Sequence, residues 1–323
     1  MVELGPLAAW IPVAIDESGI DWGDLGGIRF TEPFFHQTVE RWAGGDPQPL
    51  VRTGFDALRG LDAAPSLDPS GLIFHLSRCG STLLSRQLAT HPATLVIAEP
   101  GPVNAVLMAA LGEDERAQLL RLVIRALGRR RFGDERHYVL KLSSWNVRCL
   151  ALFRRAFPAT PAVWVQRAPA EVMASLLADP PGWLALRGAG SRDPAAFYAE
   201  TLRAMLAAMD DGVTVIDYRD LPTAAWAEAA PLFGIALGDA DIARMREEAQ
   251  YDAKNATRLP FAARPATVLP EPIRALVARD LEPLYRAVAA RRHERADEPC
   301  GVSPLGMPNA VASTTAANST LIR

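Results

Sequence analysis

The chain has 323 residues, with 34 Lys and Arg against 37 Asp and Glu and a formal net charge of −3. Hydrophobic residues make up 49% of it and charged residues 22%, the balance of an ordinary globular protein long enough for one or two domains. A net charge this close to zero argues against a nucleic-acid-binding arm and against a polybasic membrane surface.

The start of the chain does not read as a targeting segment. No Lys or Arg precedes its apolar residues, and Pro6 and Pro12 interrupt them. No window reaches the roughly 18 uninterrupted apolar residues that a membrane-spanning helix needs. The three cysteines, Cys79, Cys149 and Cys300, are too few for a disulfide framework. We therefore expect a cytoplasmic protein with neither a secretion signal nor a membrane anchor.

Composition along the chain divides it into three parts. Residues 1–70 are mixed and rich in turn residues, and we expect them to form a helical and irregular segment. One helix is expected there, with Thr31 as its N-cap and Pro33 in its first turn. Residues 71–294 form the expected main domain. Residues 295–323, which contain little besides Pro, Ser, Thr, Asn and Ala, are predicted to be a disordered tail.

Short apolar runs alternate with longer helical stretches through the main domain. The strands are predicted at 72–76, 94–98, 138–142, 162–166 and 213–217. The helices are predicted at 81–90, 103–127, 146–157, 170–178, 221–233, 240–250 and 273–291. This alternation is typical of a single α/β domain with a mostly parallel sheet flanked by helices.

The loop after the first of these strands has the residues of an anion site. A strand runs into Arg78, Gly80, Ser81 and Thr82, and then directly into an amphipathic helix. Glycine lets the backbone turn tightly around an anion, and the first amides of a helix are unpaired donors. The alternative is a tight strand-to-helix turn that the hydroxyl groups cap.

Two familiar phosphate loops do not fit the spacing. A nucleoside-triphosphatase loop would need a Lys after its last glycine, and none follows Gly80. A cysteine phosphatase loop would need an Arg six positions after its cysteine. Counting from Cys79, that position is Ser85, and Arg86 comes one residue late. We therefore interpret Cys79 as a loop residue and not as a nucleophile.

A second candidate anion segment lies about ninety residues further along the chain. Arg167 ends a predicted strand, Pro169 opens the next helix, and Ser175 follows two turns into it. The Arg fork and the Ser hydroxyl can converge on one anion. Alternatively, Arg167 forms a surface ion pair and Ser175 bonds to its own backbone.

The loop sequence Ser77-Arg-Cys-Gly-Ser-Thr-Leu-Leu, followed by His91-Pro92, resembles the 5′-phosphosulfate loop of sulfotransferases. It is most similar to the branch that contains tyrosylprotein sulfotransferases and many bacterial relatives. Cys79 stands where that loop usually has Ser, and Ser81 stands for Thr. The resemblance extends over about residues 72–222, and it implies a P-loop-NTPase-like fold.

The resemblance also implies a co-substrate and residues that bind it. The co-substrate would be 3′-phosphoadenosine-5′-phosphosulfate (PAPS), with its 5′-phosphosulfate on the loop from Arg78 to Thr82, Cys79 included. In sulfotransferases an Arg and a Ser eight residues on bind the 3′-phosphate, which here would be Arg167 and Ser175. Tyr218, in a segment like the family's Y-E-D-L, would lie near the nucleotide. Sulfuryl transfer needs no metal.

Three residues are candidates for the chemistry. Arg78 would stabilise the bridging oxygen, and Lys141, at the end of an apolar strand, would act on the sulfonate, as in relatives. Glu99 directly follows the second strand, and a Glu at this distance from the loop is the base in the tyrosylprotein branch. The alternatives are a Lys141 that snorkels to the surface and a Glu99 that pairs with a nearby Arg. His36 is a second candidate base, provided that the N-terminal segment folds over the site.

Three further assignments stay open. Lys254 and Arg258 are candidates to close over the nucleotide from the C-terminal side. The loop 180–194, with Trp183, is either an acceptor gate or a long connection. Asp217 could instead be a magnesium ligand.

The resulting prediction is a sulfotransferase that acts on an unidentified hydroxyl or amine acceptor, with no nucleic-acid or membrane partner. Two alternative functions stay open. One is a non-catalytic protein of the same fold that binds the bisphosphate product. The other is a small-molecule kinase, which the absence of a loop Lys disfavours.

Overall fold

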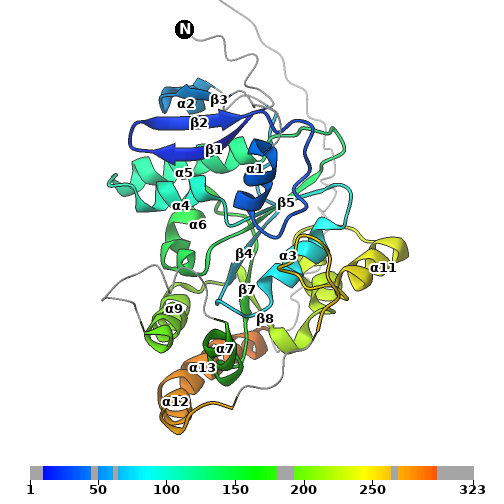
Figure 1. The fold of residues 1–323 in the computed structure, drawn as a ribbon. Helices are drawn as coiled ribbons and strands as arrows, with labels where there is room; N and C mark the ends of the chain where they lie inside the picture. Colours follow the sequence, from blue (N-terminus) through cyan, green and yellow to red (C-terminus); the bar gives the residue numbers. More distant parts are fainter. Residues whose placement is uncertain (1–9, 45–49, 61–64, 180–192, 263–267, 297–323) are drawn as a thin grey trace, which may run out of the picture.

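The main sheet of the protein has five strands, all parallel, in the order β5-β6-β4-β7-β8. The computed structural model describes residues 10–44, 50–60, 65–179, 193–262 and 268–296. The strands are β4 (Gly71–His75), β5 (Thr94–Ala98), β6 (His137–Lys141), β7 (Ala162–Gln166) and β8 (Val213–Asp217). Figure 1 shows helices on both faces of this sheet. The predicted fold class, a P-loop-NTPase-like parallel sheet flanked by helices, is confirmed.

Strand order places the loop after β4 at the centre of the sheet. From β4 the chain runs to β5 and β6 on one side, and it then crosses β4 to reach β7 and β8 on the other side, so the strand order reverses at β4. In open α/β sheets, ligands bind where the strand order reverses, outside the carboxyl ends of the strands. The register puts Lys141 beside both Ile73 and Ala98, at the carboxyl end of three neighbouring strands.

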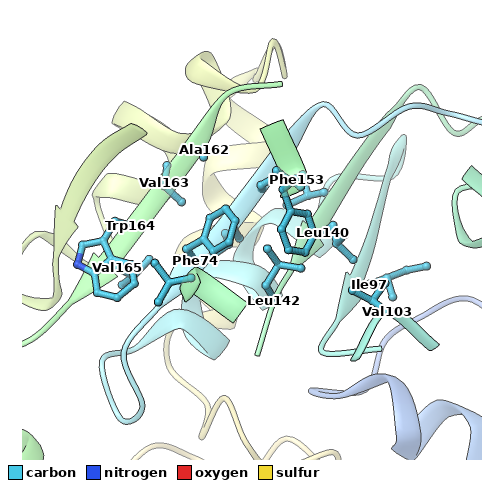
Figure 2. Packing of buried hydrophobic residues seen from close by; sticks show 14 of the residues in the cluster. Phe74, Ile97, Val103, Leu140, Leu142, Phe153, Ala162, Val163, Trp164 and Val165 are labelled. Atoms are coloured by element: carbon cyan, nitrogen blue, oxygen red, sulfur yellow. The ribbon is translucent and has the colours of Figure 1, made fainter. Parts of the chain in front are cut away.

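The core consists of these strands and the helices that cover them. Almost every strand residue is buried, because a parallel sheet covered on both faces needs continuous apolar runs. Figure 2 shows Phe74 of β4 beside Phe153, and their rings meet edge to face at 5.5 Å between centroids. The packing of these residues fixes the positions of the strand ends.

The helices follow the predicted order with several differences. The first of them is confirmed as α3 (Ser81–Ala89). The expected helix 103–127 is two helices, α4 (Gly101–Met108) and α5 (Glu113–Leu127), because Gly112 starts a new helix with three acidic residues in its first turn. The expected helix 146–157 begins as a 3₁₀ segment (Ser144–Cys149) and continues as α6 (Leu150–Ala156).

The remaining helical segments lie in the C-terminal half of the chain. They are α7 (Pro169–Ala178), α9 (Pro194–Ala208), a 3₁₀ turn (Tyr218–Asp220), a π-helical turn (Ala225–Ala229), α10 (Ala230–Leu232), α11 (Asp239–Glu248), α12 (Glu271–Leu276), a second π-helical turn (Val277–Leu281) and α13 (Glu282–Ala296). The sequence analysis did not predict α9, whose Asp193 caps its first turn.

The N-terminal part contains a second sheet that the sequence analysis missed. Three antiparallel strands, β1 (Ile11–Asp16), β2 (Gly19–Gly23) and β3 (Leu50–Thr53), lie beside α4 and α5 (Figure 1), and α2 (Asp56–Gly60) follows them. The expected helix is α1 (Phe35–Ala43), and Thr31 is not its N-cap. Phe34 after Pro33 stays extended, so the helix starts three residues later.

Two buried arginines tie the N-terminal part to the end of α5. Arg131 donates to the carbonyl oxygens of Leu25 and Ile28 at 3.0 and 2.9 Å. The Arg129 guanidinium lies 5.2 Å from the Trp22 ring centroid. Burial lowers the pKa of each arginine to about 10. No helix among the described residues combines the length and the apolar character that crossing a membrane requires.

Candidate functional site

The loop between β4 and α3 turns tightly into the helix. Arg78 has a φ of 62° and Gly80 a φ of 87°, so two residues of the loop are in the left-handed region. Gly80 is the N-cap of α3, and no side chain caps that helix. The first amides of α3 therefore remain donors for an anion, together with the buried residues Ser81 and Thr82. A turn capped by its own hydroxyls is not what forms here.

Tyr218 joins this loop to the second predicted anion segment. A Cβ at Gly80 would lie 2.7 Å from Cδ2 of Tyr218, so the ring packs directly on the loop. The Arg167 guanidinium carbon is 4.0 Å from the centroid of the same ring. The structure thus brings together Arg167 and the loop, which are far apart in the sequence.

Arg167 is held from two directions. Its Nε pairs with Glu171 at 2.6 Å, and the Tyr198 hydroxyl donates to its carbonyl oxygen at 2.8 Å. Ser175 lies half-buried on α7, and its side chain makes no hydrogen bond to another described residue. The structure therefore does not join Ser175 to Arg167 directly.

Glu99 and Lys141 meet at the carboxyl ends of β5 and β6. The Lys141 ammonium pairs with Oε1 of Glu99, and the Glu99 amide donates to the Lys141 carbonyl at 2.7 Å. The Lys141 side chain is 1% exposed, so it does not snorkel to the surface. Burial raises the pKa of Glu99, but the positive charges of Lys141 and His75 lower it by more. The pKa of Glu99 therefore lies well below the usual range of a glutamate.

Backbone strain occurs at residues of this site. Arg78, Glu99 and Arg258 are the residues other than glycine with a positive φ in the described parts of the chain. Such conformations cost energy, and they persist where the surrounding structure holds them, commonly at functional sites. Two of the three candidate catalytic residues are held in this way.

Most of the Arg78 side chain is covered by the loop and its neighbours. Its guanidinium pairs with Asp179 at 3.2 Å, and the side chain is 10% exposed. Its Nε is buried and has no hydrogen-bond partner among the described residues. An unpaired, buried donor on a guanidinium is costly unless an anion binds there.

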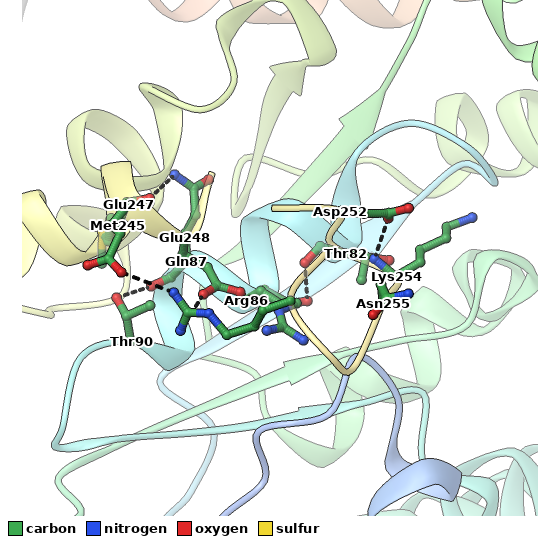
Figure 3. Close-up of polar contacts among 12 residues, drawn as sticks. Thr82, Arg86, Gln87, Thr90, Met245, Glu247, Glu248, Asp252, Lys254 and Asn255 are labelled. Carbon is green, nitrogen blue, oxygen red and sulfur yellow. Dashed lines mark hydrogen bonds and ion pairs between the residues drawn. The ribbon is translucent and has the colours of Figure 1, made fainter. Parts of the chain in front are cut away.

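Lys254 reaches the site from the C-terminal part of the chain. Arg86 of α3 pairs with Glu248 of α11 at 2.5 Å, and this pair holds the following turn, which lies beside Thr82 (Figure 3). The surrounding protein and the positive charges of Arg78 and Lys141 lower the pKa of Lys254 to about 8. Lys141, the other of the two lysines in the chain, is thus close enough for its charge to act on Lys254.

The N-terminal segment also reaches the site. The ring of Phe34 lies 5.0 Å from Nζ of Lys141 and stacks on His36 at 5.7 Å between centroids. His36 itself is exposed, and no described contact links it to Glu99. The approach of Phe34 to Lys141 has no signal in the sequence, because it depends on how the N-terminal segment packs.

The other open assignments resolve in part. Arg258 stacks on Tyr251 at 4.3 Å and pairs with Glu247 at 3.2 Å, so its own loop occupies it. Arg219 donates to the Asp217 carboxylate at 2.9 Å, and the Tyr285 hydroxyl also donates to it, which leaves little of it for a magnesium ion. Residues 180–192, including Trp183, lie outside the described residues.

Sequence reasoning missed two residues at this site. Asp179 ends α7 and pairs with Arg78, and His75 lies 3.6 Å from Glu99 at the end of β4. The histidine had a signal, since an ionisable residue stood inside an otherwise apolar strand. The aspartate had none, because its contact depends on how α7 packs.

Comparisons with family models and with curated proteins give no match. Among solved structures, the chain is similar to a sulfotransferase from Mycobacterium tuberculosis, with 18% identity over 58% of this chain and 73% of that one and a TM-score of 0.43. A sulfotransferase from Alicyclobacillus acidocaldarius shares 16% identity over 70% and 96% of the two chains, with a TM-score of 0.42. The sulfotransferase domain of a Synechococcus olefin synthase shares 17% over 61% and 83%, with a TM-score of 0.38. Likeness at this level does not bear on activity, so function has to be argued from the site.

Proposed function

We propose that this chain is a cytoplasmic sulfotransferase that moves the sulfuryl group of PAPS to a hydroxyl or amine acceptor without a metal ion. One observation carries the proposal. The Glu99–Lys141 pair stands at the strand ends beside an uncapped anion loop that holds Arg78. An anion loop alone would indicate binding, whereas a loop beside a half-buried carboxylate and a buried ammonium has the parts for group transfer.

The donor fits the charges around the loop. The amides of α3, with Ser81 and Thr82, suit the 5′-phosphosulfate, and the spare donor of Arg78 suits the bridging oxygen. Arg167, on the far side of Tyr218, suits the 3′-phosphate, with Ser175 of the following helix nearby in sequence. Lys254 adds a further cation from the C-terminal side.

The transfer is a single in-line displacement. The acceptor oxygen forms a bond to sulfur while the bond from sulfur to the bridging oxygen breaks, and that electron pair stays on the 5′-phosphate of the product. Arg78 stabilises the charge that develops on the bridging oxygen, and Lys141 stabilises the sulfonate oxygens. The acceptor proton passes to Glu99.

The pairing of Glu99 with Lys141 explains how a carboxylate with a low pKa can act as a base. A bound sulfonate competes with Glu99 for the Lys141 ammonium. As Lys141 turns to the sulfonate, Glu99 loses part of the positive charge that lowers its pKa. The carboxylate therefore becomes more basic only when the donor is present.

The Glu99→Gln variant tests this assignment. Purified protein is incubated with PAPS and a panel of phenols, alcohols and amines without magnesium, and release of adenosine 3′,5′-bisphosphate is measured. We expect acceptor-dependent release by the parent and a decrease of about a hundredfold or more in Glu99→Gln, because general bases contribute at least that much.

Two controls make the result specific. Glu113→Gln changes an exposed carboxylate that pairs with Arg155, and it should release product at the parental rate. Affinity for the bisphosphate should stay within about threefold in Glu99→Gln. Binding without turnover by the parent across the panel would favour the non-catalytic reading, and magnesium-dependent consumption of ATP would favour the kinase.

A further inference from the structure

His75, the last residue of β4, has hydrogen-bond partners that define its charge. The side chain is buried, with Nδ1 2.8 Å from the carbonyl oxygen of Leu76 and Nε2 2.7 Å from the carbonyl oxygen of Leu142. A main-chain carbonyl oxygen can only accept a hydrogen bond, so each ring nitrogen has to donate one. A neutral imidazole carries a single N–H, and both contacts are satisfied only by the doubly protonated ring.

The groups that face the ring fit this charge. Oε1 of Glu99 lies 3.6 Å from Nε2, and the same oxygen pairs with Lys141 on β6. Cys79 of the anion loop also faces the ring. Burial and the Lys141 charge lower the pKa of His75, but its interactions with Cys79 and Glu99 raise it more, to about 9. The Glu99 carboxylate thus lies between two buried cations, His75 and Lys141.

We propose that His75 is a positioning residue, a buried imidazolium that fixes Glu99 and the anion loop relative to the end of β6. Its two carbonyl contacts join the loop at Leu76 to the residue after β6, Leu142. Its charge keeps hold of the Glu99 carboxylate when Lys141 turns toward a bound sulfonate. The part that concerns Glu99 as a base rests on the proposed function, whereas the charge state of His75 does not.

Nitrogen NMR of the whole protein tests the charge directly. The protein is labelled with ¹³C,¹⁵N-histidine, the ring signal of His75 is assigned by through-bond correlation to its backbone, and long-range ¹H–¹⁵N spectra are recorded from pH 6 to 8. We expect both ring nitrogens of His75 to have the shift of protonated nitrogen throughout. His137, at the opposite end of β6, has a pKa that burial lowers, and it serves as the neutral reference at pH 8. A deprotonated His75 nitrogen at pH 7 overturns the proposal, and this reading needs no variant to fold.

Kinetics test the positioning role. Loss of the imidazolium removes a positive charge beside Glu99, so the acid limb of the pH–rate profile should move to higher pH in His75→Gln, and kcat should fall about tenfold or more, with bisphosphate affinity within about threefold of the parent. His137→Gln should leave the profile in place. An unmoved acid limb in a folded His75→Gln variant would contradict the proposal. If the parent shows no turnover at all, the proposed function fails, while the NMR spectrum still decides the charge of His75.

Discussion

At the scale of single residues, the cations around the anion loop are already paired with carboxylates from other parts of the chain. The pairs are Arg78 with Asp179, Lys141 with Glu99, and Arg167 with Glu171. A phosphate or sulfonate that binds here replaces these partners, so its affinity is the difference between two sets of charged contacts. Lys254 differs, because its ammonium has no ion-pair partner among the described residues.

Lys254 should make anion binding depend on pH. Its pKa is about 8 in the free protein, and a bound anion raises that pKa. Affinity for adenosine 3′,5′-bisphosphate should therefore be full below about pH 8 and decline as the pH rises above it, where the phosphates, with a second pKa of about 6, no longer titrate. Calorimetry from pH 6.5 to 9.5 measures the slope.

The Lys254→Met variant separates this effect from the titration of His75. It should bind more weakly at pH 7 and lose most of the decline above pH 8. Arg258→Met, which removes a neighbouring cation engaged with Glu247, should keep the decline. If the affinity of Lys254→Met for the bisphosphate declined with pH as steeply as that of the parent, another group would be responsible.

Gly80 is the loop residue whose replacement is easiest to interpret. A methyl group there would meet Tyr218 at 2.7 Å in a backbone conformation that favours glycine. Gly80→Ala should therefore weaken binding of the bisphosphate at least tenfold, about 1.4 kcal/mol. Gly133 has a similar φ of +78°, and an added methyl group there would meet nothing within 4 Å. Gly133→Ala therefore controls for the backbone strain alone. Equal affinities for Gly80→Ala and the parent would contradict the packing of Tyr218 on the loop.

The sequence could predict some of these residues because elements of regular structure carry them. Glu99 and Lys141 each follow or end a buried strand, and neighbouring parallel strands end at one edge of the sheet. Asp179 and Phe34 could not be predicted, since their contacts depend on how α7 and the N-terminal segment pack.

At the scale of elements, the five strands of the main sheet were predictable and several other elements were not. Buried parallel strands are continuous apolar runs, and each predicted strand lies within one residue of its position in the structure. The break at Gly112 was missed because the residues between the two helices contain no Pro and a single Gly. β1 contains Pro12 and is only partly buried, and half of the residues of β3 are exposed, so their apolar pattern is weak.

Gly71 shows how closely β4 packs against the C-terminal part. A Cβ at this position would lie 2.2 Å from the ring of Phe233. Gly71→Ala should therefore reduce the free energy of unfolding by about 1–3 kcal/mol through overpacking. Urea unfolding measures the loss, and Gly101→Ala, whose added methyl group meets nothing within 4 Å, should cause none. An unchanged midpoint in Gly71→Ala would mean that the ring can move aside.

At the scale of the whole molecule, three distant parts of the chain meet at one end of the central strand. The sheet supplies the loop and the Glu99–Lys141 pair, the N-terminal segment brings Phe34 to Lys141, and the C-terminal part brings Lys254. The buried contacts of Arg131 and the Arg86–Glu248 pair fix the two outer parts. The site therefore depends on the assembled fold, and isolated motifs predict only its centre.

The most direct test of the central claim is a calorimetric titration with adenosine 3′,5′-bisphosphate in the absence of magnesium. The parent should bind, and Arg167→Ala should bind at least tenfold more weakly, about 1.4 kcal/mol. Arg29→Ala, which removes an arginine paired with Asp134 beside Pro92 at the opposite end of the strands, should bind like the parent. No detectable binding to the folded parent would contradict the account.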